Sequence, residues 1–253
     1  MVPDTLPNMV KIEGGNSLRT YKMPQGCDRV QVVLKTNGRP MKALIELWCG
    51  PIRRTHMCDI DMQDGAKTPF RELLKFKNTD SAGPMVLRIG TKESFEFPVL
   101  AGVNPLTPEQ SAEANAFTEE VWETRGIKTY SQGAKTIRRV PIPAGVEAVQ
   151  LVVWARDVGK KSFRAKIELL QGPNNVKQQY TLQCGGGSQP YHAILQTPGP
   201  GWALRLTNLK NLEDGAFEFC VAPYQSDIPM IDDGKPVVDA SSFEPSEKSW
   251  WDR

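Results

Sequence analysis

The sequence has few residues of the types that form chemical sites. Its 253 residues include two histidines and five cysteines, an odd number with no CxxC pair. This argues against both a disulfide framework and a structural zinc site. His56 and Cys58 would share one face of a strand, but the sequence places no further ligand near them. We expect a buried or half-exposed histidine rather than a metal ligand, and no cofactor.

Long apolar runs and an excess of charge of one sign are also missing. No stretch approaches the roughly 20 apolar residues of a membrane-spanning helix. The chain carries 31 Lys and Arg against 29 Asp and Glu, and its basic pairs at 53–54, 138–139 and 160–161 lie far apart. A nucleic-acid binder usually concentrates such charges in one patch. We therefore expect neither membrane insertion nor a nucleic-acid partner, and residues 1–10 lack the features of a targeting segment.

Signatures of catalysis are absent as well. The sequence has no GxSxG, no HExxH and no catalytic Cys-His-Asn pattern. Gly185, Gly186 and Gly187 follow an expected strand but lack the lysine of a phosphate-binding loop, so we interpret them as a flexible turn. The chain is not expected to be an enzyme, and we assign no catalytic residue.

The sequence does contain a repeat. ALIELWCGP begins at Ala43, and AKIELLQGP begins at Ala165. Three further pairs of segments follow the same order: MPQGCDRVQVVL with IPAGVEAVQLVV, MVLRIG with WALRLT, and FEFPV with FEFCV. Four matched blocks predict a duplicated unit of about 85 residues. The second copy carries extra residues around 156–161.

Both copies show the alternation of apolar and polar residues that is typical of strands. Ala43, Ile45 and Leu47 alternate with polar neighbours, and a period of two places them on one face of a sheet. Turn signals recur every 8–12 residues or so, as in antiparallel sandwiches. We predict an all-β fold made of two similar antiparallel β-sandwich-like domains, related by a pseudo-twofold axis.

Two polar features recur within the repeat. Each copy has a mid-strand glutamate, a mid-strand arginine that we expect opposite it, and a Gly-Pro pair that ends a strand. We interpret these residues as structural, with the Glu–Arg pair acting as a clasp rather than as an acid catalyst. This structural repeat motif consists of Glu46, Gly50, Pro51, Arg88, Glu168, Gly172, Pro173 and Arg205.

The segment between the copies differs in character. Thr107, Pro108 and Gln110 form a capping-box pattern, which predicts one helix over 108–124 that packs on or bridges the two sandwiches. We expect its inner face to include Ala112, Ala116 or Phe117, Val121 and Trp122. The expected units are an arm (1–15), repeat one (16–103), a linker (104–130), repeat two (131–224) and an extended C-terminal arm (225–253).

The C-terminal arm is rich in proline and polar residues, and it ends in SWWDR. Such a composition does not form a core by itself. Aromatic anchors at the end of an extended arm suit docking into a pocket of the same or a neighbouring subunit. We therefore assign Trp250, Trp251 and Arg253 as candidate self-assembly residues, the alternative being a tail folded back on its own sandwich.

The doubled IELWCGP and IELLQGP motifs, the FEFPV and FEFCV segments and the tandem layout resemble the pyrenoid shell proteins of diatoms. The resemblance covers about residues 16–224. It implies a chloroplast protein at the pyrenoid periphery that assembles with itself into a sheet around the Rubisco-rich matrix. Such a sheet would support carbon dioxide concentration and fixation, and Rubisco or other pyrenoid proteins are the further partners that the resemblance implies.

A second hypothesis remains open. Tandem sandwiches also serve as binding modules for carbohydrate or protein ligands. In that case Trp48, Trp154 or Trp202 would be exposed and would stack on the ligand.

Overall fold

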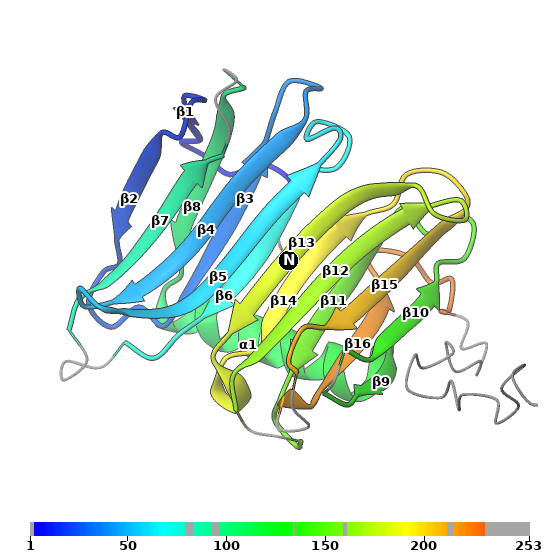
Figure 1. The fold of residues 1–253 in the computed structure, drawn as a ribbon. Coiled ribbons are helices and arrows are strands. Elements are labelled where there is room, and N and C mark those ends of the chain that lie inside the picture. The colour runs from blue at the N-terminus through cyan, green and yellow to red at the C-terminus, as the bar shows by residue number, and fades with distance from the viewer. Residues whose placement is uncertain are drawn as a thin grey trace, which may run out of the picture.

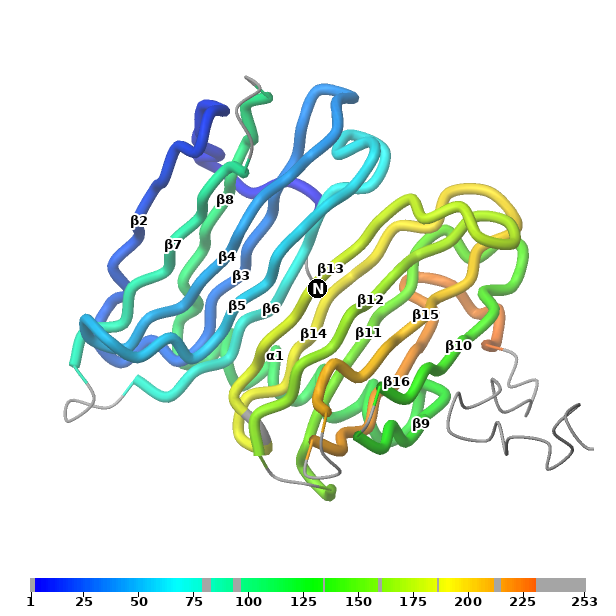
Figure 2. Tube along the Cα trace, in the orientation of Figure 1, coloured from blue at the N-terminus to red at the C-terminus, as the bar shows by residue number. Residues whose placement is uncertain are grey.

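A computed structural model shows the fold (Figure 1) and describes residues 3–78, 83–92, 97–133, 135–158, 161–211 and 215–230. These residues contain 16 strands in two antiparallel sheets of eight, which confirms the all-β prediction. Both sheets run through both repeats, as the tube in Figure 2 also shows. The repeats therefore form one continuous double layer.

We call the two sheets the rear sheet and the front sheet, after their positions in Figure 1. In spatial order, the rear sheet contains β1 (Val10–Ile12), β8 (Val99–Pro105), β3 (Arg29–Lys35), β6 (Phe70–Lys75), β14 (Tyr191–Gln196), β11 (Ala148–Trp154), β16 (Phe217–Pro223) and β9 (Ile127–Ser131). The front sheet contains β10 (Ile137–Pro141), β15 (Trp202–Asn208), β12 (Phe163–Gln171), β13 (Val176–Cys184), β5 (Arg53–Met62), β4 (Met41–Cys49), β7 (Met85–Thr91) and β2 (Leu18–Lys22).

The expected alternation produces the core. Along β4 every second side chain is buried, and the neighbours on the other face are half-buried. The inward side chains of both sheets and both repeats join in a single apolar cluster, which includes Val32, Ile45, Leu151 and Ile167. The hydrophobic effect thus stabilises the two repeats together rather than as separate cores.

One block of the sequence alignment is wrong. On the rear sheet, Val30 lies opposite Pro105 and its counterpart Val149 lies opposite Pro223. The strand that matches FEFCV is therefore VLAGVNP, the sequence of β8, rather than FEFPV. The pairing of strands in the sheet shows which segments are equivalent, and the similarity between FEFPV and FEFCV does not reflect equivalent positions. The expected N-terminal arm also contributes a strand, β1, which pairs with β8.

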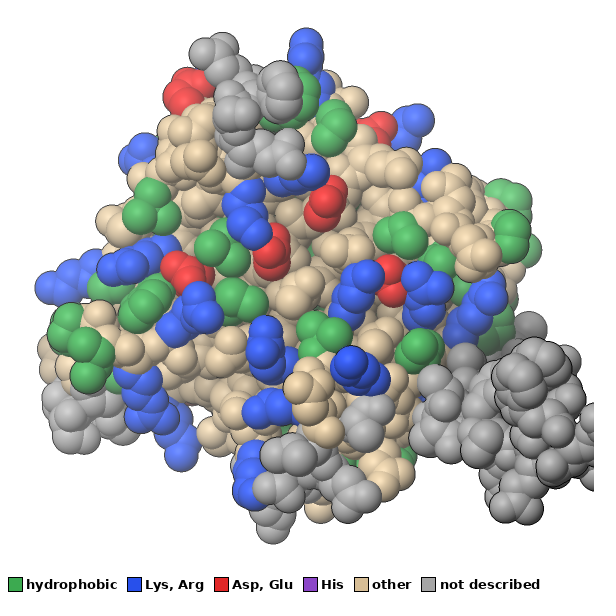
Figure 3. Space-filling view, in the orientation of Figure 1, with side chains coloured by type: hydrophobic (Ala, Val, Ile, Leu, Met, Phe, Trp, Pro, Cys, Tyr) green, Lys and Arg blue, Asp and Glu red, His purple; other side chains and the backbone are tan. Residues whose placement is uncertain are grey.

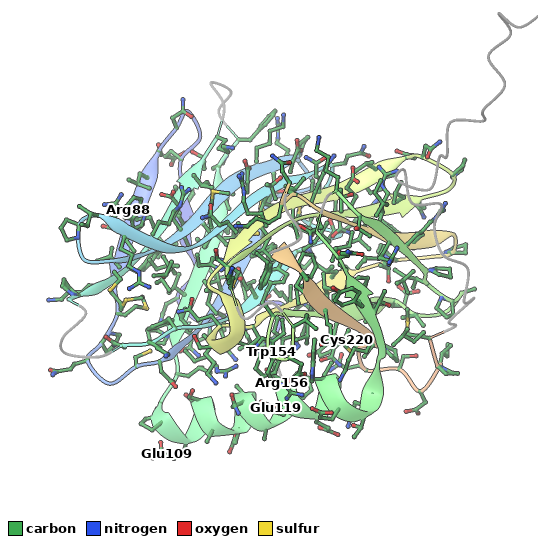
Figure 4. The ribbon with its side chains drawn as sticks, turned by 60° about the horizontal axis from the view of Figure 1, so that its bottom comes forward. Arg88, Glu109, Glu119, Trp154, Arg156 and Cys220 are labelled. Atoms are coloured by element: carbon green, nitrogen blue, oxygen red, sulfur yellow. The ribbon has the colours of Figure 1, made fainter. Side chains whose placement is uncertain are left out.

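Helix α1 (Pro108–Glu120) begins at the predicted capping box, in which the Thr107 hydroxyl accepts from the Gln110 backbone N–H and the Gln110 side chain accepts from the Thr107 N–H. A π-helical turn, η2 (Val121–Arg125), continues it to Gly126. The helix lies across the outer face of the rear sheet (Figure 4), where Phe117 packs against side chains of both repeats.

The inner face of the helix is more polar than expected. Val121 and Trp122 are buried as predicted, but Ala112 and Ala116 are exposed. Ser111 and Thr118 take their place, because polar groups on the sheet meet them. The Ser111 hydroxyl donates to Asp28 Oδ1 at 2.5 Å, and Thr118 Oγ1 lies 3.0 Å from His192 Nδ1. The spacing of apolar residues along the helix could not predict which polar residues of the helix face polar groups on the sheet.

Candidate functional site: the seam between the repeats

On the rear sheet the repeats join through β6 and β14, which occupy equivalent places in the two copies. Arg29 of repeat one lies opposite Lys75, and the matching residue Ala148 lies opposite Gln196. This correspondence makes Glu72 and Ala193 counterparts, and the seam pairs these two residues directly. A strand that pairs antiparallel with its own counterpart, centred on one residue, has twofold geometry.

The front sheet repeats this arrangement. Here β5 pairs with its counterpart β13, and Asp59 lies opposite Thr181. These two residues are also counterparts, because Ala43 lies opposite Ile60 and Ala165 lies opposite Leu182. Both seams are therefore centred on equivalent residues, as they would be in a symmetric dimer.

The core of the seam contains an ion pair. His56 and Glu72 have side chains that are 2% and 0% exposed, and Nε2 of His56 lies 3.1 Å from Oε1 of Glu72. Burial alone would lower the pKa of His56, but the negative charge of Glu72 raises it to about 10. His56 is thus protonated at neutral pH. Cys58 shares its face, as predicted, whereas the proximity of Glu72 and Cys184 was not visible in the sequence.

The other half of the seam core is neutral. Gln178 and Tyr180 occupy the positions that correspond to His56 and Cys58, and the Tyr180 hydroxyl donates to Gln178 Oε1 at 2.6 Å. The Gln178 amide donates to the Gln196 carbonyl at 2.7 Å. The seam is therefore symmetric in backbone and asymmetric in charge.

The repeat motif forms its clasp in repeat two. Glu168 lies opposite Arg205, and Arg205 Nε donates to Glu168 Oε2 at 2.8 Å. Lys166 Nζ lies 2.9 Å from the other carboxylate oxygen. Burial raises the pKa of Glu168, but its two cationic partners outweigh this effect and lower it.

Repeat one has the same register with different partners. Glu46 lies opposite Arg88, yet its carboxylate accepts from Arg54 Nη1 at 2.5 Å and from Trp48 Nε1 at 3.2 Å. The Arg88 guanidinium instead lies over the Trp48 ring, 4.8 Å from its centroid. The register was predictable, but the exchange of partners was not, because it depends on Arg54 and Trp48.

The Gly-Pro pairs behave alike in both copies. Gly50 has φ of 63° and Gly172 has φ of 83°, in the left-handed region that favours glycine. The Gly50 N–H donates to the Pro84 carbonyl at 3.0 Å, and the Gly172 N–H donates to the Gly201 carbonyl at 2.9 Å. Pro51 and Pro173 follow directly, where each strand ends.

The extra residues of repeat two anchor the helix. Arg156 lies 2.9 Å from Glu119 and 2.5 Å from Glu123, and it also covers the Trp154 ring. Figure 4 labels Arg156 beside Glu119 and Trp154. The insertion therefore ties α1 to repeat two.

Two grooves open at the ends of the seam. One, of about 650 Å³, is lined by Asp64, Lys177 and Trp202 among others, and the other, of about 380 Å³, includes Arg53 and Lys77. The described linings contain no histidine. In the described part of the chain, no group of three or more His, Cys, Asp and Glu could hold a metal ion, and no helix is long and apolar enough to cross a membrane.

The glycine run beside the second groove forms a turn. A 3₁₀ helix, η3 (Gly186–Ser188), follows β13, and the Gly187 carbonyl accepts from Trp154 Nε1 at 2.7 Å. Trp154 and Trp202 are 5% and 6% exposed, so the prediction that they are stacking platforms is wrong. Trp48 is half-buried beneath Arg88.

The outer face of the front sheet carries more basic than acidic side chains. Figure 3 shows Lys and Arg distributed over this face with fewer Asp and Glu between them. Counterparts at its two edges are basic as well: β2 contains Arg19 and Lys22, and β10 contains Arg138 and Arg139. The candidate assembly residues Trp250, Trp251 and Arg253 lie outside the described residues.

Comparison with known proteins identifies one family. A family model described as diatom pyrenoid shell protein matches residues 3–223. No curated protein matches the chain.

Likenesses to solved structures are distant. The chain is similar to a protein in the atomic structure of Sulfolobus turreted icosahedral virus, at 13% identity over 85% of this chain and 91% of that one, with a TM-score of 0.25. It is similar to the turret protein A223 of that virus, at 13% identity over 85% and 97%, with a TM-score of 0.22. It also resembles the stem and receptor-binding domain of spike protein P1 from bacteriophage PM2, at 12% identity over 86% and 96%, with a TM-score of 0.23. At these TM-scores the likenesses carry no further argument.

Proposed function

The chain belongs to the diatom pyrenoid shell protein family, and we propose that it is a non-enzymatic structural protein that assembles with copies of itself into a sheet around the Rubisco-containing matrix, in the chloroplast. The observation that carries the proposal is the seam, which fuses two repeats into one double layer with equivalent strands at opposite ends. A subunit with similar strands at its two ends favours contacts that continue from copy to copy rather than closing into a ring. The sheet would support carbon dioxide concentration and fixation.

The charges of the sheet edges restrict how copies meet. Direct pairing of β2 in one copy with β10 in the next would bring basic residues together, and basic edge strands resist such pairing. A contact of opposite charge is needed. Residues 231–253 carry six Asp and Glu against three Lys and Arg. We therefore assign the tail, with Trp250, Trp251 and Arg253, as the tie to the basic front face of a neighbouring copy.

The boundaries are part of the same proposal: repeat one at 16–103, the linker at 104–130, repeat two at 131–224, and arms at 1–15 and 225–253. The alternative, a binding module for a carbohydrate or protein ligand, loses two of its three expected stacking platforms, because Trp154 and Trp202 are buried.

Electron microscopy of the purified chain tests the function. Sheets or tubes are expected for the full chain, and monodisperse particles at all salt and protein concentrations would refute self-assembly. Deletion of residues 247–253 separates the two parts of the proposal. Weaker assembly after the deletion supports the tail as a tie, whereas unchanged sheets would place the contact elsewhere and leave the structural role intact.

A further inference from the structure

Two cations of repeat one converge on one neutral oxygen. Arg29 begins β3 and Lys75 ends β6, and the two residues lie directly opposite each other in the ladder. Arg29 Nη2 donates to Asn115 Oδ1 at 3.1 Å, and Lys75 Nζ donates to the same oxygen at 2.7 Å. Like charges opposite each other on a sheet are destabilising, and an amide oxygen carries only a partial negative charge to offset them.

Arg29 is also deeply buried and poorly paired. It is 1% exposed, its Nε has no hydrogen-bond partner, and no carboxylate among the described residues lies at ion-pair distance from it. The negative charge of Asp28 acts on Arg29, but the Asp28 carboxylate accepts a hydrogen bond from the Ser111 hydroxyl. Burial lowers the pKa of Arg29 and of Lys75, which shows that both positive charges are partly desolvated. The negative charge of Asp28, and at Lys75 also that of Glu119, offsets only part of this effect, and a buried charge that is incompletely compensated is costly.

A groove of about 500 Å³ opens at this point. Its lining includes the two cations Arg29 and Lys75, one carboxylate, Asp28, and the polar side chains of Ser111 and Asn115, together with Pro108 at the first turn of α1. Glu109, labelled in Figure 4, marks the start of that helix. The first turn of a helix favours negative charge through its backbone dipoles. A buried cation, a half-buried cation and the start of a helix therefore meet in this groove.

We propose that this groove binds a small oxyanion, a phosphate or a carboxylate group, between Arg29 and Lys75. The groove holds two cations and one carboxylate, Asp28, so the anion supplies the negative charge that Asp28 and the Asn115 amide do not provide. The guanidinium and ammonium groups form charge-assisted hydrogen bonds with its oxygens. The shell role and this site are independent of each other.

The site belongs to repeat one alone. The positions that correspond to Arg29 and Lys75 in repeat two are Ala148 and Gln196, which also face each other in the ladder. The single helix starts over repeat one, so no second helix start is available to repeat two among the described residues. One anion per chain is therefore expected.

Calorimetric titration of the full chain at low ionic strength tests the site, with inorganic phosphate in one arm and acetate in the other. Binding of phosphate alone, or of acetate alone, identifies the chemistry of the group, and saturation at one anion per chain supports the site. Lys75→Gln should lower the affinity about tenfold or more, because it removes one charge-assisted hydrogen bond. The matched control is Lys177→Gln, at the large groove of the seam, which should leave the affinity unchanged.

A second variant guards against misfolding of the first. Asn115→Asp places a carboxylate where both cations already converge. It should raise the thermal midpoint in anion-free buffer and abolish the further rise that phosphate causes in the wild-type chain. The proposal is overturned if neither anion binds, if Lys75→Gln binds as the wild type does, or if N115D keeps the full response to phosphate.

Discussion

At the centre of the seam, repeat one places Glu72 where repeat two places Ala193, and it places His56 where repeat two places Gln178. The backbones match in register, so the difference lies in the side chains, and repeat one alone carries the charged pair. If two copies of repeat one paired in the same way, two Glu72 carboxylates would face each other at a site where the side chain is 0% exposed. Such a contact is strongly unfavourable.

This comparison shows how a duplicated protein can direct its own pairing. Symmetric strands alone would allow repeat one to pair with repeat one of another chain. The buried charge penalises that product, whereas the pairing of unlike repeats, which the chain itself supplies, avoids the penalty. In this interpretation the ion pair contributes specificity, and its effect on stability depends on keeping both partners.

The largest effect is expected from breaking the pair. Glu72→Ala leaves His56 buried without its counter-charge and should lower the free energy of unfolding by about 3 kcal/mol or more. Urea titration of the full chain measures this loss. The double variant H56Q/E72A gives repeat one the residues of repeat two and should recover much of it. A double variant as unstable as the single one would show that the loss comes from packing rather than from charge.

The two histidines should give opposite pH responses. His56 has a folded pKa of about 10 against an ordinary value of 6.5, so its contribution to stability is complete below pH 6.5 and is lost as the pH rises towards 10. Burial, followed by the charge of Arg29, lowers the pKa of His192 to about 3, so its contribution is complete above pH 6.5 and is lost as the pH falls towards 3. Each slope approaches about 1.4 kcal/mol per pH unit.

Urea unfolding measured from acid to alkaline pH separates the two effects. H56Q/E72A should reduce the loss of stability at high pH (the alkaline limb of the curve), and His192→Asn should reduce the loss at low pH (the acid limb). An alkaline limb that persists in H56Q/E72A would contradict the assignment to the seam.

Smaller losses of stability, equal in the two repeats, are expected at the Gly-Pro turns, where the repeats have the same geometry. Gly50→Ala and Gly172→Ala each force an alanine into positive φ, at a cost of about 1–2 kcal/mol. A Cβ at Gly172 would meet nothing within 4 Å, so backbone strain alone should account for its loss. Gly90→Ala is the control, because that glycine does not have positive φ and a Cβ there would make only ordinary contacts. Unequal losses at Gly50 and Gly172 would show that the two turns are not equivalent.

The sequence was sufficient where local rules decide the structure. Alternation predicted the strands around Ile45 and Ile167, and the capping box predicted the start of α1 at Pro108. The glycines of the repeat motif occupy the turns that their type suggests. Each of these features depends on residues within one element, so a single sequence carries the information.

The seam and the groove could not be read in the same way. Glu72 lies beside His56, and Lys75 beside Arg29, only because the order of strands in each sheet brings them together. That order is set by non-local pairing, which leaves no pattern in the sequence. The polar face of α1 was missed for a related reason, because Thr118 faces His192 of a distant strand.

The smallest predicted difference concerns the clasp. Arg205→Gln removes the 2.8 Å hydrogen bond to Glu168, which is 3% exposed and then keeps only Lys166 as an ionic partner among the described residues, so we expect a loss of about 1–2 kcal/mol. Arg88→Gln removes only a guanidinium over Trp48, for about 0.5–1 kcal/mol, because Glu46 has other donors. Urea titration of both variants in parallel compares the losses. If Arg88→Gln costs as much as Arg205→Gln, the two repeats hold their clasps alike, and the exchange of partners at Glu46 has no energetic consequence.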